Sequence, residues 1–175
     1  QPQIFGSSES DSTEMVKSTI THEIVIGLCG PIGAPINMIN EYLGNEIKSR
    51  GYKIEHIKIS EIIDTLADDD FNRYDFFERK SKLIDAGNEL RERYGAEILV
   101  EHAISKIYEG RIKEREEGGN GNFEPRMVCY VINSLKNLAE IELLQSLYTK
   151  MFYLIGVYAK REDRISNLTS QQDNK

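Results

Sequence analysis

The sequence predicts an α/β fold in which a parallel sheet is covered by helices on both faces. Two observations carry this prediction. Short, mostly apolar stretches alternate with longer amphipathic ones, and the short stretches are apolar almost throughout. Strands buried on both faces have this pattern, and helices are the usual connection between parallel strands. The chain of 175 residues has the size of one domain with a sizeable core.

Four strands are expected, each preceded and followed by polar residues or glycine. They are residues 23–29, 52–60, 127–132 and 151–159. After the first strand, apolar residues recur at three- and four-residue steps and predict an amphipathic helix that ends at Gly51. The residues of its apolar stripe are Ile36, Ile39, Leu43 and Ile47.

The segment between the second and third strands is predicted to be mainly helical. Ser60 is expected to cap a short helix over 61–67. An acidic loop then leads into two consecutive helices, which are separated near Gly95, and the Gly-rich residues 118–125 predict a flexible connection. A further amphipathic helix is expected over 138–150, between the last two strands.

One domain is expected over residues 22–165. Residues 1–21 are rich in Ser, Glu and Gln and predict a flexible tail, and the polar residues 166–175 predict a frayed tail or linker. Cys29 and Cys129 each lie in an apolar run. We therefore expect two buried free thiols and a cytoplasmic protein.

Charge and hydropathy limit the partners of the chain. Its formal net charge of -7 argues against nucleic acid as the main partner, because proteins that bind a phosphate backbone carry a basic face. The Lys- and Arg-rich stretch 106–115 keeps a regulatory RNA as an alternative. No apolar run approaches the ~20 residues that cross a bilayer, so no membrane partner is expected.

Residues 24–40, IVIGLCGPIGAPINMIN, have the strand, Gly-rich turn and helix of a phosphate-binding loop. With Gly30 as the first glycine of Gly-x4-Gly-Lys-Ser/Thr, the last three positions hold Pro35, Ile36 and Asn37. These changes remove a backbone N–H, the ammonium that reaches the phosphates and the hydroxyl that binds magnesium. A hydrogen bond to a charged group is worth roughly 1.5–3 kcal/mol. Phosphoryl transfer depends on positioning and charge and is therefore not expected here.

Binding of a nucleotide or phosphate without turnover remains an expectation for this loop, with a purely structural turn as the alternative. The amides from Gly30 to Ala34 and the positive end of the following helix still attract an anion. The loop residues assigned to a nucleotide site are Gly27, Gly30, Pro31, Ile32, Gly33, Ala34 and Asn37.

No catalytic residue and no metal ligand is assigned. After the third strand, Asn133 stands where phosphate-loop enzymes commonly place an aspartate that holds magnesium through water. With Asn37, two magnesium-handling positions are amides. His22, His56 and His102 lack metal-binding spacing, and the chain lacks the His-x-Glu and Pro-Cys-x-x-Cys pair that zinc deaminases need.

Three further residues, Asn88, Arg91 and Lys136, are assigned to the nucleotide site. Arg91 lies three residues after Asn88, so both share a helix face, and its guanidinium suits an anionic ligand. Lys136 follows the third strand, and Arg161 and Arg164, after the fourth, are further cations at the same edge of the sheet. The alternative for Arg91 is an ion pair with Glu89, Glu92 or another carboxylate.

Five segments together resemble, in this order, the N-terminal phosphate-loop domain of bacterial anti-phage dCTP deaminases, and they cover about residues 23–165. They are IVIGLCGPIGAPIN, GYKIEHIKIS, LIDAGNELRERYG, MVCYVINSLKNLAEIELL and FYLIGVYAKREDR. More distantly, the pattern is similar to deoxynucleoside-monophosphate kinases. The resemblance implies a P-loop NTPase fold of the nucleotide-kinase type, a three-layer sandwich. The matching positions are Gly27, Gly30, Gly33, Asp85, Asn88, Arg91, Ser134, Lys136 and Glu140.

In that family a zinc-dependent deoxycytidylate deaminase domain follows, and the enzyme depletes the dCTP pool during phage infection. The resemblance implies that this chain is the nucleotide-sensing or regulatory half, with the zinc confined to a deaminase half that this chain lacks. Its expected partners are a nucleotide, that deaminase domain and further copies of the chain, as a homo-oligomer. Two alternatives stay open: a stand-alone nucleoside or nucleotide kinase, and a scaffold that binds protein or RNA through other surfaces.

Overall fold

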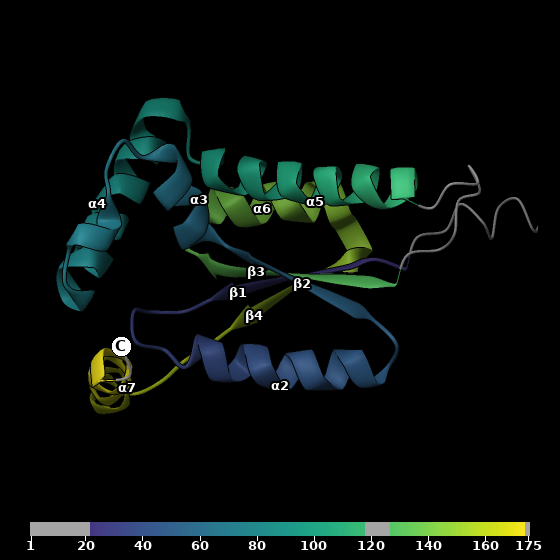
Figure 1. The fold of residues 1–175 in the computed structure, drawn as a ribbon. Coiled ribbons are helices and arrows are strands. Elements are labelled where there is room, and N and C mark those ends of the chain that lie inside the picture. The colour runs from purple at the N-terminus through teal and green to yellow at the C-terminus, as the bar shows by residue number, and fades with distance from the viewer. Residues whose placement is uncertain (1–21, 118–126, 174–175) are drawn as a thin grey trace, which may run out of the picture.

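The computed structural model describes residues 22–117 and 127–173. The tail expected at 1–21 and the connection expected at 118–125 lie outside the described residues. The described residues form one four-stranded parallel sheet and six α-helices (Figure 1). The predicted α/β class and parallel sheet are thus confirmed. None of the described helices combines the length and the apolar character that spanning a bilayer takes.

All four expected strands are present, and they lie in the order β2-β3-β1-β4. Their bounds are β1 Ile24–Cys29, β2 Lys53–Lys58, β3 Val128–Leu135 and β4 Phe152–Gly156. The two central strands, β3 and β1, are buried along almost their whole length. β3 continues further than expected, so Asn133 lies inside the strand, near its carboxyl end.

Helices cover both faces of the sheet and also stand at one of its ends. In Figure 1, α2 lies below the sheet, α3, α5 and α6 lie above it, and α4 and α7 stand at the end toward which the strands point. The helices are α2 Ile36–Ser49, α3 Ile59–Leu66, α4 Phe76–Tyr94, α5 Ile98–Glu117, α6 Leu138–Tyr148 and α7 Arg161–Asp173. Short 3-10 turns, η1 Phe71–Arg73 and η2 Thr149–Met151, precede α4 and β4.

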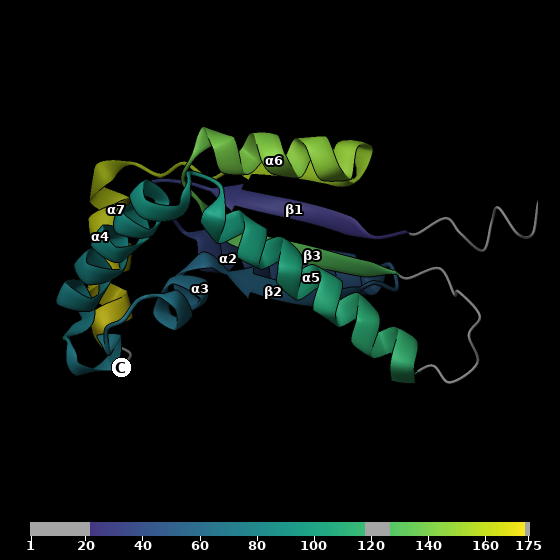
Figure 2. The same ribbon diagram turned by 90° about the horizontal axis from the view of Figure 1, so that it is seen from above.

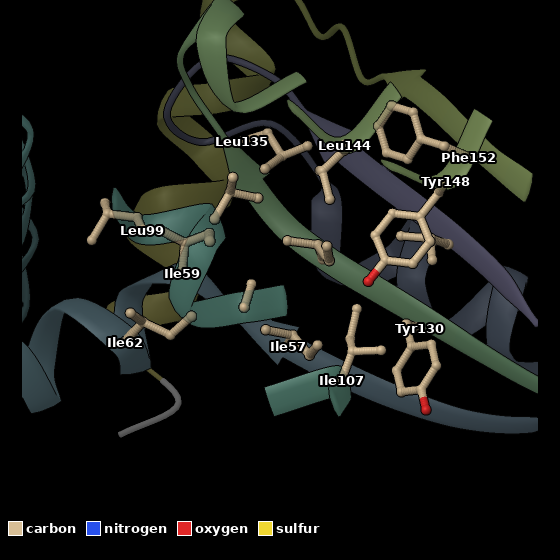
Figure 3. Close-up of a cluster of buried hydrophobic side chains, with 14 of the residues drawn as sticks. Ile57, Ile59, Ile62, Leu99, Ile107, Tyr130, Leu135, Leu144, Tyr148 and Phe152 are labelled. Atoms are coloured by element: carbon tan, nitrogen blue, oxygen red, sulfur yellow. The ribbon is translucent and has the colours of Figure 1, made fainter. Parts of the chain in front are cut away.

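Two apolar cores lie on the two faces of the sheet. On the lower face, the predicted stripe of α2 packs against β1 and β3 through Ile26, Leu28, Cys129 and Val131. The upper core is larger, and Figure 3 shows side chains such as Ile57, Ile107 and Leu144 meeting from β2, α5 and α6. The free thiols expected at Cys29 and Cys129 are confirmed, the first half-buried and the second fully buried.

Two expectations about the helices are wrong. Ser60 does not cap α3, because the helix begins at Ile59, where Lys58 is the N-cap and provides no side-chain cap. The early start buries Ile59 together with Ile62 on the upper core. The expected frayed end is instead helical as far as Asp173, because α7 packs on the Gly-rich turn after β1.

Candidate functional site

β1 and β3 stay paired to their carboxyl ends, and the segments that follow them diverge to opposite faces of the sheet, with a crevice between these segments. β1 continues into α2 on the lower face, and β3, its neighbour in the sheet, continues into α6 on the upper face (Figures 1 and 2). In open parallel sheets, ligands bind at such a switch point, outside the carboxyl ends of the strands. The Gly-rich turn and the segment after β3 both lie here.

A cavity of about 560 Å³ occupies this crevice. Its volume lies in the range of about 300–1,000 Å³ that is typical of small-molecule sites. Apolar side chains of α3 and α4 form part of its wall, including Ile63, Phe76 and Leu83. No carboxylate of the described residues lines it, and five cationic side chains do: Lys58, Arg79, Lys80, Arg91 and Lys136.

Most of the residues assigned to the site from sequence line this cavity. They are Pro31, Ile32, Gly33, Ala34, Asn37, Asn88, Arg91 and Lys136. Gly27 and Gly30 do not line it. Gly27 is buried in β1, where a Cβ atom would come within 2.5 Å of Leu135 Cδ1. Its role is therefore to leave room for the Leu135 side chain of the neighbouring strand β3. Asp85 also lies elsewhere and lines a second cavity beside α4.

The Gly-rich turn is closed by its own hydrogen bonds. The Ala34 amide donates to the Pro31 carbonyl at 3.0 Å, and the Ile36 amide donates to the Ala34 carbonyl at 2.8 Å. Among the described residues, several amides of the turn and of the start of α2 have no backbone acceptor, and Ile32, Gly33 and Asn37 are three of them. They are the donors that an anion bound at this helix N-terminus would use.

A lysine lies at the turn, although the turn itself supplies none. Lys136, which follows β3, donates from Nζ to the Gly30 carbonyl at 2.5 Å. Burial lowers the pKa of the Lys136 ammonium, and the nearby guanidinium of Arg91 acts in the same direction. An ammonium has three donors, so it can hold the Gly30 carbonyl and still donate to an anion in the cavity. Lys136 thus lines the cavity beside the turn, and its assignment to a nucleotide site stays a prediction.

The chain after β4 packs directly on the turn, backbone against backbone. A Cβ atom at Gly30 would come within 2.6 Å of the Val157 carbonyl oxygen, and one at Gly33 within 2.5 Å of the Arg164 carbonyl oxygen. Gly33 also has φ 79°, in the left-handed region that favours glycine. Both glycines are therefore required by the packing of the chain around α7, whatever else the turn binds.

The carboxyl end of β3 is irregular beside the cavity. The register with β1 shifts so that Leu28 pairs with Asn133 and Cys29 with Leu135, which leaves Ser134 as an extra residue with φ 70°. Such bulges often redirect side chains at functional sites. Asn133 is only 6% exposed and lines the cavity, yet its Oδ1 has no hydrogen-bond partner among the described residues. An unpaired buried acceptor costs about 1–3 kcal/mol, which a ligand or water donor would recover.

Arg91 is engaged in a buried ion pair. Its Nε and Nη2 donate to Glu140 Oε1 at 3.0 and 2.8 Å, and its Nη1 donates to the Gly87 carbonyl at 3.2 Å. Glu140 is fully buried and also accepts from the amides of Lys136 and Asn137. Arg91 thus forms the ion pair that was the alternative to ligand binding, and its partner is Glu140, 49 residues away, instead of Glu89 or Glu92. Arg91 therefore ties α4 to the start of α6 at the edge of the cavity.

Sequence reasoning did not find three of the cations around the cavity. Lys58 is the last residue of β2 and pairs with Glu61 at 2.9 Å. Its place at the carboxyl end of a strand could have indicated from sequence that it lies at the site. Arg79 and Lys80 on α4 carried no such signal, because their placement depends on how α4 folds back over the strand ends. Arg79 Nη2 is 3.8 Å from Asp64, and its Nε is buried without a partner among the described residues.

The cavity is lined by hydrogen-bond donors, and it has side-chain amides at the two positions that handle magnesium in a phosphate-loop enzyme. Asn37 and Asn133 both line it. Within residues 22–117 and 127–173, no three His, Cys, Asp or Glu side chains lie close enough together to hold a metal ion. The arrangement suits an anion held by ammonium, guanidinium and backbone N–H groups.

The basic stretch 106–115 is partly used for folding. Arg111 donates from Nε and Nη2 to the carboxylate of Glu23 at 3.1 and 2.5 Å, and Glu23 is only 3% exposed. Burial lowers the pKa of Arg111, but the hydrogen bond and charge of Glu23 outweigh this effect and raise it. This ion pair reduces the charge that the stretch could offer to RNA.

Compared with known proteins, the chain matches no protein-family model and no curated protein sequence.

Proposed function

We propose that this chain is a regulatory domain that senses a nucleotide, which it binds in the cavity without transferring a phosphoryl group. The proposal is carried by one observation: a cavity at the β1–β3 crevice with five cationic and no acidic side chains among its described lining. A nucleotide has an anionic part for the cations and a flat, partly apolar part for the wall formed by α3 and α4. Carboxylates outside the lining pair with three of the five cations, Lys58, Arg79 and Arg91. The support for an anion site therefore comes mainly from the Lys136 ammonium beside the amides of the Gly-rich turn.

The fold and the partner follow from the sequence resemblance. On this proposal the chain has the P-loop NTPase fold, and it is the regulatory half of a cytosolic anti-phage enzyme that deaminates deoxycytidine nucleotides. The sensed ligand is then a deoxycytidine nucleotide, and the zinc chemistry belongs to the deaminase half. The β2-β3-β1-β4 sheet with helices on both faces is compatible with this reading.

A second candidate, a nucleotide kinase, is favoured by the position of Lys136. Its ammonium lies against the Gly-rich turn and could take the place of the lysine that the turn lacks. The amides of Asn37 and Asn133 argue against this candidate, because phosphoryl transfer also needs the metal to be positioned. Release of phosphate at an ordinary enzymatic rate, about 10 per second, would favour the kinase and contradict the sensing role.

The test of binding is thermal unfolding with dCTP, dCMP and ATP, each with magnesium and with a chelator. A ligand at 100 times its dissociation constant stabilises a protein by about 2.7 kcal/mol, which shifts the midpoint of a domain this size by several degrees. We expect dCTP or dCMP to give the largest shift. If none of the three nucleotides moves the midpoint in either condition, the sensing function is wrong.

Lys136→Met is expected to weaken nucleotide binding by about tenfold or more. The substitution removes a charged donor that is worth roughly 1.5–3 kcal/mol to an anion. The matched control is Lys48→Met, an exposed lysine at the other end of α2, about 18 Å along the helix from its start. Titration calorimetry gives the dissociation constant of the nucleotide for each variant. If Lys136→Met and Lys48→Met lose the same amount of affinity, Lys136 is not part of the site.

A further inference from the structure

The last helix of the described chain is part of the wall of the cavity. Leu168 and Gln171 of α7 line it, beside the Gly-rich turn. Figures 1 and 2 both place α7 at the end toward which the strands point, the end where α4 also lies. A ligand that fills the cavity would therefore contact α7 as well as the body of the domain.

The described contacts between α7 and the rest of the domain come from one face of the helix. Its half-buried residues are Arg164, Asn167, Leu168 and Gln171, at helical spacing, so one face of the helix meets the domain. Among residues 161–172 of α7, whose burial the structure describes, none belongs to the buried core. A helix held by one narrow, mostly polar face is expected to open locally at a much lower free energy than the core requires.

The contacts of α7 are made with the turn that the ligand would use. Arg164 Nη1 donates to the Ile32 carbonyl at 3.3 Å, and Asn167 Nδ2 donates to the Gly33 carbonyl at 3.1 Å. Arg164 Nε is also buried and has no partner among the described residues. The docked helix therefore fixes the turn and brings an unused guanidinium donor to it.

We propose that α7 docks on the Gly-rich turn more tightly when a nucleotide fills the cavity, so that the helix reports whether the site is occupied. The inference rests on the proposed function and adds its regulation. Because a ligand favours the state with which it makes more contacts, it shifts α7 toward the docked state. By linkage, undocking α7 weakens nucleotide binding by the same factor.

The test is limited trypsin digestion of the full chain, with release of the C-terminal peptide followed by mass spectrometry. Cleavage after Arg164, which lies inside α7 and is half-buried, requires the helix to open, so the rate at which peptide 165–175 appears follows the open population. With saturating dCTP, or the panel nucleotide that gives the largest thermal shift, we expect release to slow at least fivefold, the lower end of typical couplings.

Asn167→Ala, compared with Ser166→Ala, separates coupling from mere stability. Asn167 holds the turn, whereas the neighbouring Ser166 is exposed. Asn167→Ala is expected to release the peptide faster without nucleotide, while Ser166→Ala does not. Nucleotide binding weakens in Asn167→Ala only as far as α7 becomes undocked, and by no more than the factor by which nucleotide slows release in the unmodified chain. A thermal shift without slower release, or a larger loss of affinity than that factor, overturns the coupling and leaves the sensing function standing. The absence of any thermal shift overturns both.

Discussion

Glu140 accepts four hydrogen bonds although it is fully buried, two from Arg91 and two from the amides of Lys136 and Asn137. Together with the Asn137 side chain, which accepts from the Ala139 amide, it forms the capping box at the start of α6. A buried carboxylate is tolerated only with such full pairing. At the scale of single residues, this carboxylate holds the backbone of Lys136 and Asn137 in place, and the Lys136 side chain can then reach the turn.

Arg91→Ala is expected to lower the free energy of unfolding by about 3–5 kcal/mol, because it leaves a buried charge without its partner. Adding Glu140→Gln should recover part of the loss, since a neutral amide still accepts from the two backbone amides. Arg50→Ala is the control, because its pair with Glu46 at 3.7 Å is exposed and worth little. Urea unfolding measures all three, and a loss for Arg91→Ala no larger than for Arg50→Ala would contradict the anchoring role.

Cys129 makes stability fall at high pH. Burial raises the pKa of its thiol from 9.0 to about 11. Above pH 9 the unfolded chain therefore releases this proton more readily than the folded one, and stability is lost as pH rises toward 11. Two pH units correspond to at most about 3 kcal/mol. Denaturant unfolding from pH 8 to 11 should show a smaller fall for Cys129→Ala, and parallel curves for variant and wild type would contradict this.

At the scale of elements, the Gly-rich turn and α7 form one unit. The turn has the glycine spacing of a phosphate loop, but Gly30 and Gly33 also lie where the chain after β4 makes backbone contact. From sequence these glycines predicted an anion site, with a structural turn as the alternative, and nothing in the pattern indicated the contact with the chain after β4. α7 was not predicted because its contact face, with Leu168 as its one apolar residue, gives no amphipathic pattern.

Gly33→Ala is expected to destabilise the protein and to loosen α7, because the new Cβ meets the Arg164 carbonyl and φ 79° strains an L residue. Gly110→Ala, inside α5, is the matched control, since its Cβ meets nothing closer than 3.9 Å. That change should stabilise by about 0.5–1 kcal/mol. Thermal unfolding and the peptide-release assay compare the two variants. If Gly33→Ala changes the unfolding midpoint and the release rate no differently from Gly110→Ala, backbone strain at Gly33 is not what its glycine relieves.

At the scale of the whole molecule, the sheet and both covering layers could be predicted because burial on two faces leaves continuous apolar runs in sequence. The stripe of α2 was predicted for the same reason, and it packs as expected. The rest depends on distant contacts. Arg91 meets a glutamate 49 residues away, and Arg79 reaches the cavity only because α4 folds back over the strand ends. No local pattern carries such information.

The position of a bound nucleotide tests the central claim most directly. A crystal structure of the full chain with dCTP should show the phosphates between the Pro31–Ala34 turn and the Lys136 ammonium, with the base against α3 and α4. It should also show α7 docked over the turn. Phosphates bound elsewhere, or a turn that remains closed to them while dCTP binds at another face, would contradict the account.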